Sequence, residues 1–577
     1  MHIILYKIIR QIVFEFYHVG VIIMENAWWK EAVGYQIYPR SFQDSNGDGI
    51  GDLQGIIQRL DYLKDLGIDF IWVCPFYKSP LDDNGYDISD YQDILADFGT
   101  MDDFDELLEE VHKRDMKLLM DLVLNHTSDE HPWFIESRSS KDNPKRDWYI
   151  WKDPKDGKEP NNWESIFSGS AWEYDEKTKQ YFLHVFSRRQ PDLNWENSEV
   201  RTALYEMVNW WLDKGVDGFR IDAISHIKKR PGFPDMPNPE GKKYVSSFDM
   251  HMNQEGIHEF LQEFRDETYG KYEHALSVGE ANGVSTDDAH LWVGDEGKMD
   301  MLFQFEHMDL WDYETGKGMD VIGVKKALTR WQKALEHNGW NALYIENHDK
   351  PRIISSWGNE TDYWRESATA LGTMYFLMKG TPFIYQGQEI GMTNIYFNSI
   401  EDYDDVAAKN LYQDQKEGGV SEQEILYTLG KTSRDNSRTP MQWSSEENAG
   451  FSTGNPWLKV NANHTEINVE KQLQEKDSIL QFYKDMIQLK KKHTIFTYGS
   501  YDLLLPDDEQ IFAYKRELDG QLAVIVTNLS DQETVWEVDD HMKITDKQII
   551  LSNYKVEPHE YVKNVHLKPY EARVYLI

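Results

Sequence analysis

Short apolar runs of five to seven residues alternate with amphipathic helical stretches along most of the chain. Helical spacing is clearest in LQGIIQRLDYLKDLG (53–67) and MDDFDELLEEVHKRD (101–115). Eight strands that alternate with crossover helices are typical of a (β/α)8 or TIM barrel rather than an open doubly wound sheet. The eight predicted strands span residues 34–38, 69–73, 117–123, 216–221, 275–280, 301–305, 341–346 and 382–387. The sequence therefore predicts an α/β fold closed into a barrel.

Two insertions and a change of pattern divide the chain. Residues 127–195, after the third predicted strand, are rich in Trp, Asp, Lys and Pro, and residues 394–445, after the eighth, are acidic and helical. After about residue 500, short alternating runs such as IFAYKREL and QLAVIVTNLS predict a small antiparallel β domain. We expect a barrel over 24–126 and 196–500 with a subdomain near 394–445, an inserted domain over 127–195, and a C-terminal β domain over 501–577.

The charge and the aromatic content limit the classes of ligand. The 577 residues carry a formal net charge of −39, which argues against nucleic acid and anionic membranes as partners. Twenty Trp and 32 Tyr suit flat-faced ligands such as sugars, although large α/β enzymes commonly carry many aromatics. The single cysteine, Cys74, lies in an apolar run, so we expect a core residue and a reducing, cytoplasmic location.

The first 23 residues are apolar but interrupted by charge. Lys7, Arg10 and Glu15 interrupt the apolar run, and no small-residue cleavage site follows it. From Met24 onwards the sequence is typical of a folded enzyme. We expect translation to begin at Met24 and residues 1–23 to be a non-native or disordered leader. A membrane anchor is the second interpretation and a signal peptide the third.

Reactive side chains follow four of the predicted strands. Polar residues at the carboxyl ends of barrel strands face the active site. Three carboxylates and two imidazoles converge there, without a metal-ligand spacing such as HExxH, and this set suits cleavage of a glycosidic bond. The residues are Asn125 and His126, Arg220 and Asp222, Glu280, and His348 and Asp349.

A retaining mechanism needs a carboxylate nucleophile and a carboxylic acid about 5 Å away. Asp222 is the better nucleophile, because Arg220 lies two residues back on the same face of its strand and favours the ionised form. Glu280 follows an apolar strand, where desolvation favours the protonated form that an acid needs. Each motif alone is weak, since an Asp after a strand is usually a cap or a turn residue. Their joint occurrence at successive strand ends carries the prediction.

The four segments DLVLNHTS, GFRIDAIS, VGEA and ENHDKPR resemble the signature regions of the α-amylase family, glycoside hydrolase family 13. SPLDDNGYDISDY, FQFEHMDL, GTPFIYQGQEIGMTN and SRDNSRTPMQW resemble its oligo-1,6-glucosidase and α-glucosidase subgroup. The resemblance covers residues 24–577. It implies a catalytic barrel, a domain inserted after strand three and a C-terminal β domain.

The resemblance also implies roles for individual residues. Asp222 would be the nucleophile, Glu280 the acid/base and Asp349 a third carboxylate that grips sugar hydroxyls, while His126 and His348 would bind hydroxyls at the same subsite. Asp83 and Arg434 would fix the non-reducing glucose, with Arg434 chosen over Arg438 by motif alignment, and Tyr86 would stack on the sugar ring. A closed pocket of this kind would release single glucose units from short chains.

The residue after the nucleophile bears on the linkage. In this subgroup Val there accompanies α-1,6 preference and Ala or Thr accompanies α-1,4 preference, so Ala223 favours a maltose-type α-glucosidase. An oligo-1,6-glucosidase and a trehalose-6-phosphate hydrolase remain as alternatives, the latter without a marked phosphate site. The loop after strand six lacks the arginines of sucrose isomerases. Gln388, where the subgroup usually has Glu, is expected to affect the acceptor side.

A non-enzymatic alternative comes from relatives that serve as transporter heavy subunits. These keep the barrel, lose catalytic residues and hang from an N-terminal membrane helix. Here every catalytic position matches the motif, so an enzyme is favoured. We expect a monomer that acts on a small oligosaccharide, without nucleic acid or membrane partners.

The stretch DSNGDGIGD (44–52) resembles the first part of an EF-hand loop. Position twelve is Gly55 and not the bidentate Glu of a calcium sensor. Relatives bind a structural Ca²⁺, sometimes Mg²⁺, at the matching segment, which lies between the first strand and its helix. The side chains of Asp44, Asn46, Asp48 and Asp52, with the Ile50 carbonyl, are the predicted ligands.

Overall fold

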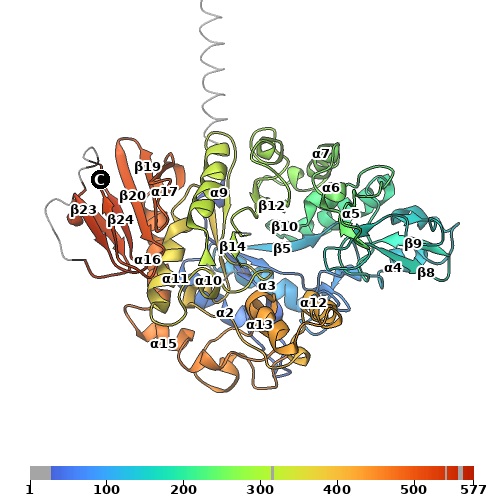
Figure 1. Cartoon of the computed structure of the whole chain (residues 1–577), viewed down its shortest axis with the longest axis horizontal. Helices are drawn as coiled ribbons and strands as arrows, with labels where there is room; N and C mark the ends of the chain where they lie inside the picture. The colour runs from blue at the N-terminus through green and yellow to red at the C-terminus, as the bar shows by residue number, and fades with distance from the viewer. Residues whose placement is uncertain (1–26, 309, 313–317, 540–541, 543, 557–562) are drawn as a thin grey trace, which may run out of the picture.

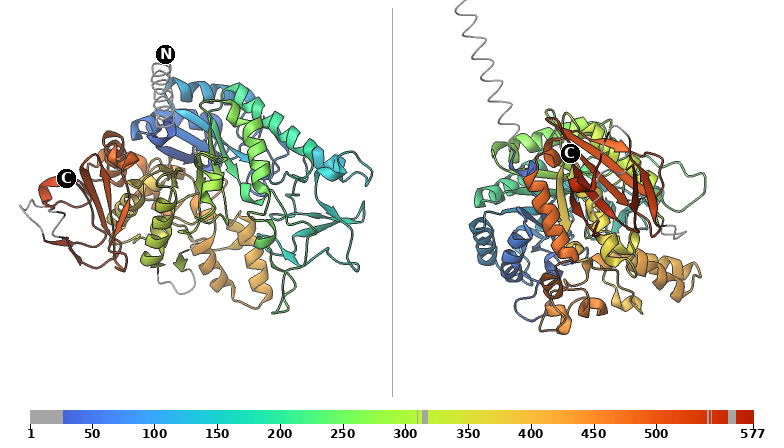
Figure 2. Two further views of the ribbon diagram at one scale, coloured as in Figure 1. Left: turned by 90° about the horizontal axis from the view of Figure 1, so that it is seen from above. Right: turned by 90° about the vertical axis from the view of Figure 1, so that its left-hand side faces the viewer.

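The computed structural model describes residues 27–308, 310–312, 318–539, 542, 544–556 and 563–577 (Figure 1). The predicted leader, residues 1–23, lies outside this part of the chain. In Figure 1 a central barrel is flanked on one side by the C-terminal β-sheet and on the other by small sheets from the segment after the third barrel strand. Figure 2 shows the same order from above. No helix of the described residues has the length and apolar character needed to cross a membrane.

Eight parallel strands form the barrel, and each coincides with one of the eight predicted strands. Their order is β13-β12-β10-β5-β2-β1-β17-β16, so the first strand pairs with both the second and the last. A bridge between Leu302 and Asn341 joins the two remaining edges. The strands are β1 (Gly34–Ile37), β2 (Phe70–Val73), β5 (Lys117–Val123), β10 (Gly218–Asp222), β12 (Leu276–Glu280), β13 (Met301–Phe303), β16 (Ala342–Leu343) and β17 (Thr381–Tyr385).

Helices cover the outside of the barrel, and most of the long ones, though not α7 and α11, begin at a side-chain cap. Asp52 accepts from the backbone N–H of Gly55 at the start of α2, and Thr100 and Asp103 form a capping box on α3. The crossover after β12 contains only the short helix α8 (Ala289–Trp292). The long helices are α2 (Leu53–Leu66), α3 (Met101–Lys113), α5 (Ser198–Lys214), α7 (Ile257–Glu267), α9 (Val321–Ala334), α11 (Trp364–Phe376) and α16 (Ile479–Lys492).

The segments outside the barrel form small sheets and helices of their own. After β5 come α4 (Pro132–Ser137), β6 (Trp151–Lys152), β7 (Trp163–Glu164), β8 (Trp172–Asp175) and β9 (Gln180–Leu183). The hairpin β3 (Tyr77–Lys78) and β4 (Asp90–Ile94) follows β2, and β11 (Val245–Ser246) and α6 (Phe248–His251) follow β10. The hairpin β14 (Trp311–Asp312) and β15 (Gly318–Met319) precedes α9, and α10 (Ile353–Ser356) precedes α11. After β17 come α12 (Val406–Glu417), α13 (Glu422–Thr432), α14 (Asp435–Arg438), α15 (Val469–Gln474) and α17 (Ile495–Tyr498).

The C-terminal β domain is antiparallel, as its alternating pattern predicts. One sheet has the order β18-β19-β20-β24-β22, and β21 pairs with β23 in a second. Arg516 of β19 is fully buried and donates to the carbonyls of Leu377 and Phe496, which ties this domain to the barrel. The strands are β18 (Asp502–Leu504), β19 (Ile511–Leu518), β20 (Gln521–Asn528), β21 (Thr534–Glu537), β22 (Ile549–Ser552), β23 (Asn564–Leu567) and β24 (Ala572–Leu576).

Aromatic side chains fill the interior of the barrel. The ring centroids of Phe303 and Phe383 lie 4.8 Å apart, and those of Trp72 and Phe303 lie 5.4 Å apart. Cys74 is buried with them, as predicted. Because the barrel interior is a packed core and not a pore, no ligand fits inside it, and the active site of such a barrel lies above the carboxyl ends of the strands.

Candidate active site

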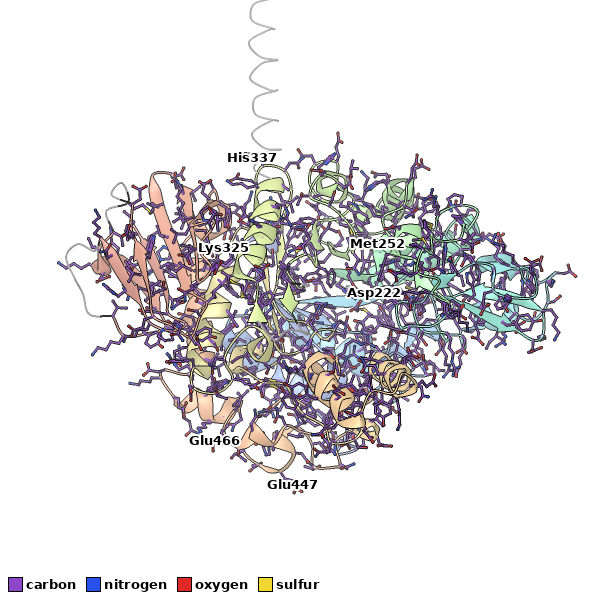
Figure 3. The ribbon with its side chains drawn as sticks, in the orientation of Figure 1. Asp222, Met252, Lys325, His337, Glu447 and Glu466 are labelled. Atoms are coloured by element: carbon purple, nitrogen blue, oxygen red, sulfur yellow. The ribbon has the colours of Figure 1, made fainter. Side chains whose placement is uncertain are left out.

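A cavity of about 690 Å³ opens above the carboxyl ends of the barrel strands. Eight of the ten predicted catalytic and substrate-binding residues line it: Asp83, Tyr86, His126, Asp222, Ala223, Glu280, Asp349 and Arg434. Arg220 and His348, the other two, lie behind this wall. Figure 3 labels Asp222 near the middle of the molecule and Met252, a further lining residue, above it.

Neighbouring strands bring the first two carboxylates together. β10 and β12 pair in register with Ile221 opposite Gly279, so Asp222 and Glu280 follow at the same level. Arg220 joins them, because its Nη1 lies 2.7 Å from Asp222 Oδ1 and its Nη2 contacts Glu280 Oε2. The same Nη1 lies 2.8 Å from Asp121 Oδ1. The single guanidinium of Arg220 thus forms ion pairs with three carboxylates.

The charge balance of this cluster favours bound protons. Burial raises the pKa of Asp222 above its ordinary value; Arg220 lowers it, and the charges of Glu280 and Asp121 raise it. Burial likewise raises the pKa of Asp121 to about 6. With all three carboxylates ionised the cluster would carry a net charge of −2, which together with burial gives Asp222 and Asp121 a higher pKa than a free Asp. The predicted contact of Arg220 with Asp222 is present, but the prediction that it keeps the pKa of Asp222 low is wrong, because burial outweighs it and the same guanidinium is shared with Asp121 and Glu280.

The third carboxylate lies between two arginines. Asp349 Oδ1 is 2.9 Å from Arg438 Nη2 and 3.4 Å from Arg434 Nη1. Burial opposes ionisation of Asp349, but His348, Arg434 and Arg438 hold its pKa well below the usual range. Asp349 is therefore a permanent anion at neutral pH, suited to accepting hydrogen bonds from hydroxyl groups.

Arg434 forms part of the cavity surface, whereas Arg438 lies deeper. Arg434 Nη2 is 3.1 Å from Asp83 Oδ1 and 2.6 Å from Asp405 Oδ1. Arg438 is fully buried and its Nε donates to the His348 carbonyl. Of the two arginines, Arg434 has the position that the predicted contact with substrate requires.

His348 is held by protein groups at both ring nitrogens. Its Nε2 lies 2.7 Å from the Tyr86 hydroxyl, its Nδ1 lies 2.7 Å from Gln36 Nε2, and its ring stacks on that of Tyr86. The structure thus places His348 behind Tyr86, and its predicted hydroxyl contact stays a prediction. His126 lies in the wall, 3.1 Å from the amide of Gln190, and burial lowers the pKa of His126 to about 4.

Three polar residues that bind the predicted site residues from behind the cavity wall are absent from the sequence-based set. Asp121 binds Arg220 and accepts from Tyr86; an Asp inside the apolar run KLLMDLV was the available signal. Gln190 donates to Asp83, and Asp405 binds Arg434, but both lie in the two insertions and outside any strand or helix, where spacing indicates no face.

Gln388 does not reach the cavity. It is buried, and its amide donates to the hydroxyls of Tyr375 and Tyr483. The prediction that Gln388 affects the acceptor side is therefore wrong, because the 3₁₀ turn after β17 directs this side chain into the core between helices α11 and α16.

The stretch DSNGDGIGD is held by its own hydrogen bonds. Both oxygens of Asp44 accept, from the N–H groups of Asn46, Gly47 and Gly49 and from Ser452 Oγ, and Asp52 accepts from Ser45 and from the N–H of Gly55. Within the described residues no three acidic, His or Cys side chains are grouped as a metal would require. The oxygen donors suit Ca²⁺ or Mg²⁺ in kind, and the metal site stays a prediction.

Comparisons with known proteins agree with this architecture. A family model for the α-amylase catalytic domain matches residues 36–499, and one for a maltogenic amylase C-terminal domain matches residues 501–574. The chain is 57% identical to the "Probable oligo-1,6-glucosidase 3" of Bacillus subtilis, over 96% of this chain and 100% of that one. It is 54% identical to the oligo-1,6-glucosidase of Parageobacillus thermoglucosidasius, with the same coverage.

A solved structure is also close. The crystal structure of the trehalose-6-phosphate hydrolase of Bacillus licheniformis superposes with a TM-score of 0.88 at 45% identity, covering 96% of this chain and 100% of that one. The two matching domain models, the full-length relatives and the cluster of carboxylates at the strand ends lead to one conclusion. The chain belongs to the α-amylase family, glycoside hydrolase family 13, and is a glycoside hydrolase.

Proposed function

We propose that the protein is a retaining exo-α-glucosidase that releases glucose from the non-reducing end of short α-1,6-linked oligosaccharides such as isomaltose. The observation that carries the linkage is the identity of 57% and 54%, over almost the whole chain, to relatives named oligo-1,6-glucosidases. This proposal departs from the α-1,4 preference expected from Ala223.

The closed end of the cavity supports attack on chain ends. Asp83, Arg434 and Asp405 form a continuous group of ion pairs there, and Asp83 is 4% exposed. A terminal glucose has hydroxyl groups that satisfy such charges, whereas a longer chain has no path through them. The pocket therefore favours single glucose units at the non-reducing end.

In this proposal Asp222 attacks the anomeric carbon while Glu280 donates its proton to the leaving oxygen. A glucosyl ester forms on Asp222 and the aglycone departs. Glu280, now ionised, takes a proton from water, and that water displaces Asp222 with overall retention of configuration. Arg220 contacts both carboxylates, so it stabilises whichever of them is ionised at each stage.

Two substitutions test these roles. Asp222→Asn should lower kcat on isomaltose on the order of 10⁴-fold or more, as loss of a nucleophile does elsewhere. Glu280→Gln should lower kcat/KM on isomaltose by roughly 10²–10⁴-fold, but far less on p-nitrophenyl α-glucoside, whose leaving group needs little protonation. Equal losses on both substrates would contradict the acid role of Glu280.

Ala223 favours a second candidate, an α-1,4-specific enzyme acting on maltose. The similarity to a trehalose-6-phosphate hydrolase structure adds a third substrate to compare. Measuring kcat/KM on isomaltose, maltose and trehalose 6-phosphate separates the three. We expect isomaltose to be the best substrate; a clear preference for either of the others would replace the linkage but not the glycosidase mechanism.

We also propose that the 44–52 loop binds a structural Ca²⁺ or Mg²⁺ through Asp44, Asn46, Asp48, Ile50 and Asp52. Chelation should then lower the Tm, and a stoichiometric cation should be found in the purified protein by elemental analysis. An unchanged Tm with no cation would make the loop a glycine-rich turn held by its hydrogen bonds alone.

A further inference from the structure

A second cavity, of about 560 Å³, lies on the outside of the barrel. It is enclosed by β4 (Asp90–Ile94), the start of α4 (Pro132–Ser137) and α5 (Ser198–Lys214), and it shares no lining residue with the active-site cavity. Its lining residues are Ser89, Asp90, Tyr91, Gln92, His131, Pro132, Trp133, Ala203, Glu206, Met207 and Trp210. The cavity therefore has walls from three separate elements and no part in the catalysis described above.

Two half-buried tryptophans give this cavity aromatic walls. Trp133 is fixed in place by edge contacts, with its ring centroid 4.5 Å from that of His131 and 5.0 Å from that of Trp148. Trp210 is similarly fixed against Trp211, at 4.7 Å. Rings held in this way offer apolar surface at a small cost in conformational entropy.

Most polar groups around the two rings are neutral or negative; the exception is Lys214, whose Nζ lies 5.4 Å from the centroid of the Trp210 ring and pairs with Asp105. Asp90, Gln92 and Glu206 are exposed at the rim and offer carboxylate and amide groups. The carboxylates disfavour anionic ligands, and the polar rim disfavours a purely apolar one. The C–H face of a sugar ring suits an indole, and its hydroxyl groups suit carboxylates and amides, so the lining fits an uncharged saccharide.

His131 adds a hydrogen-bond donor that the fold does not use. The residue is 4% exposed, and its Nδ1 accepts from the backbone N–H of Trp133 at 3.1 Å. Burial, with the nearby charge of Lys145, lowers the pKa of His131 to about 3, so the neutral ring carries its proton on Nε2. Among the contacts of the described residues Nε2 has no partner, and His131 lines the cavity. A ligand or water in the cavity can supply the acceptor for this N–H.

We propose that this cavity is a second carbohydrate site that binds a neutral gluco-oligosaccharide without cleaving it. The sugar ring lies against Trp133 or Trp210 and accepts a hydrogen bond from His131 Nε2. Tyr91 links the walls of the two cavities by hydrogen bonds. It lines the outer cavity, and its hydroxyl donates to the carbonyls of Val123 and of His126, which lines the active site. A sugar held here lies on the outer side of the segment that carries His126.

Calorimetric titration of the full chain tests the proposal. The Asp222→Asn variant prevents cleavage, and isomaltotriose and maltotriose serve as probes. We expect two sites per chain for at least one probe. Adding Trp210→Ala to this variant should lower the affinity of the outer site for the probe about tenfold, the loss expected for one aromatic contact. Trp210→Phe should retain most of the affinity, and Gln92→Ala, an exposed change at the rim, should weaken binding roughly fivefold.

Matched controls separate this site from the active site. Tyr427→Ala removes an aromatic ring that is 58% exposed on α13 and lines neither cavity, so it should change neither site. Trp210→Ala in the otherwise unchanged enzyme should leave hydrolysis of p-nitrophenyl α-glucoside unaltered. One site per chain with both probes, or two sites that Trp210→Ala and Gln92→Ala leave unchanged, would overturn the proposal. Because the titration does not depend on cleavage, a wrong linkage in the proposed function would not affect it.

Discussion

The two ends of the active-site cavity differ in kind. The closed end is built from charges that satisfy one another: Asp83 and Arg434 lie 3.1 Å apart, and Asp405 lies 2.6 Å from the same guanidinium. The other end, which we call the mouth, is lined by α6 and by the loop after β12; Phe248 of α6 is 39% exposed, and Met252, which follows α6, is half-buried. One end is rigid and polar, and the other is apolar and partly open.

This difference separates two tasks. Buried ion pairs have one good geometry, because each charge that loses its partner pays the full desolvation penalty, so the closed end accepts one sugar in one orientation. Apolar contacts at the mouth are non-directional and adapt to different partners. We infer that the closed end sets the requirement for a terminal α-glucose and that the mouth decides which linkage and aglycone follow.

Breaking the closed end should have the largest effect. Arg434→Met leaves Asp83 and Asp405 without their cation, and we expect kcat/KM on isomaltose to fall on the order of 10²–10³-fold. Arg434→Lys keeps the charge but not the planar fork, so it should recover only part of the loss. Steady-state kinetics should show equal losses of kcat/KM on isomaltose and maltose, because the closed end contacts the terminal glucose and not the linkage. A loss confined to one substrate would contradict the division of tasks.

The loop that carries Asp83 should show a pH-dependent stability. Asp87 is fully buried and accepts from the N–H groups of Asp82 and Asp83 and from Ser79 Oγ. Burial raises the pKa of Asp87 to about 7, above its value in the unfolded chain. Its contribution to stability is therefore present at low pH and is lost as the pH rises through about 7.

The comparison of wild type with Asp87→Asn measures this contribution. Between pH 5 and pH 7 the wild type should lose up to ~3 kcal/mol of unfolding free energy relative to the variant, which has no proton to release. Denaturant unfolding at several pH values checks it, with the exposed Asp142→Asn as a control that should track the wild type. A difference that does not change with pH would show that Asp87 acts by hydrogen bonding alone.

Ala223 tests the linkage at the catalytic centre. It follows the nucleophile with a φ of 43°, a left-handed conformation that is costly for β-branched residues. Ala223→Val should raise the ratio of kcat/KM on isomaltose to kcat/KM on maltose. The increase should be roughly tenfold if one methyl-sized contact determines the linkage preference. Ala223→Thr carries the same branching and strain, so it is the matched control and should leave the ratio near that of the wild type. Because Thr and Val have nearly the same shape, equal effects of both would assign the change to side-chain size or strain and not to an apolar contact.

The mouth should respond least. Met252→Ala removes a flexible apolar contact, and we expect a change of only a few-fold in kcat/KM, confined to substrates with a sugar aglycone. Hydrolysis of p-nitrophenyl α-glucoside should change less than hydrolysis of isomaltose. A loss as large as that of Arg434→Met would mean that the mouth, too, is rigidly specified.

Sequence patterns predicted the parts of this molecule that follow regular geometry. The barrel strands were found because buried parallel strands form apolar runs, and Asp222, Glu280 and Asp349 were found because strand ends converge at one face. Gln190 and Asp405 were missed because irregular insertions have no period from which a direction can be derived. Gln388 was misplaced for a related reason, since successive side chains in a 3₁₀ turn point about 120° apart and no longer follow the alternation of the strand before it.

The pairing of β1 with β17 has a consequence for the order of synthesis. Gly34 lies opposite Phe383, so the first barrel strand pairs with a residue made 349 positions later (383 − 34). At about 5–20 residues per second, β1 keeps one unpaired edge for roughly 20–70 s while the chain is made. An open edge of this kind is prone to pairing with other chains. The protein must therefore keep a nascent strand from aggregating until its last barrel strand leaves the ribosome.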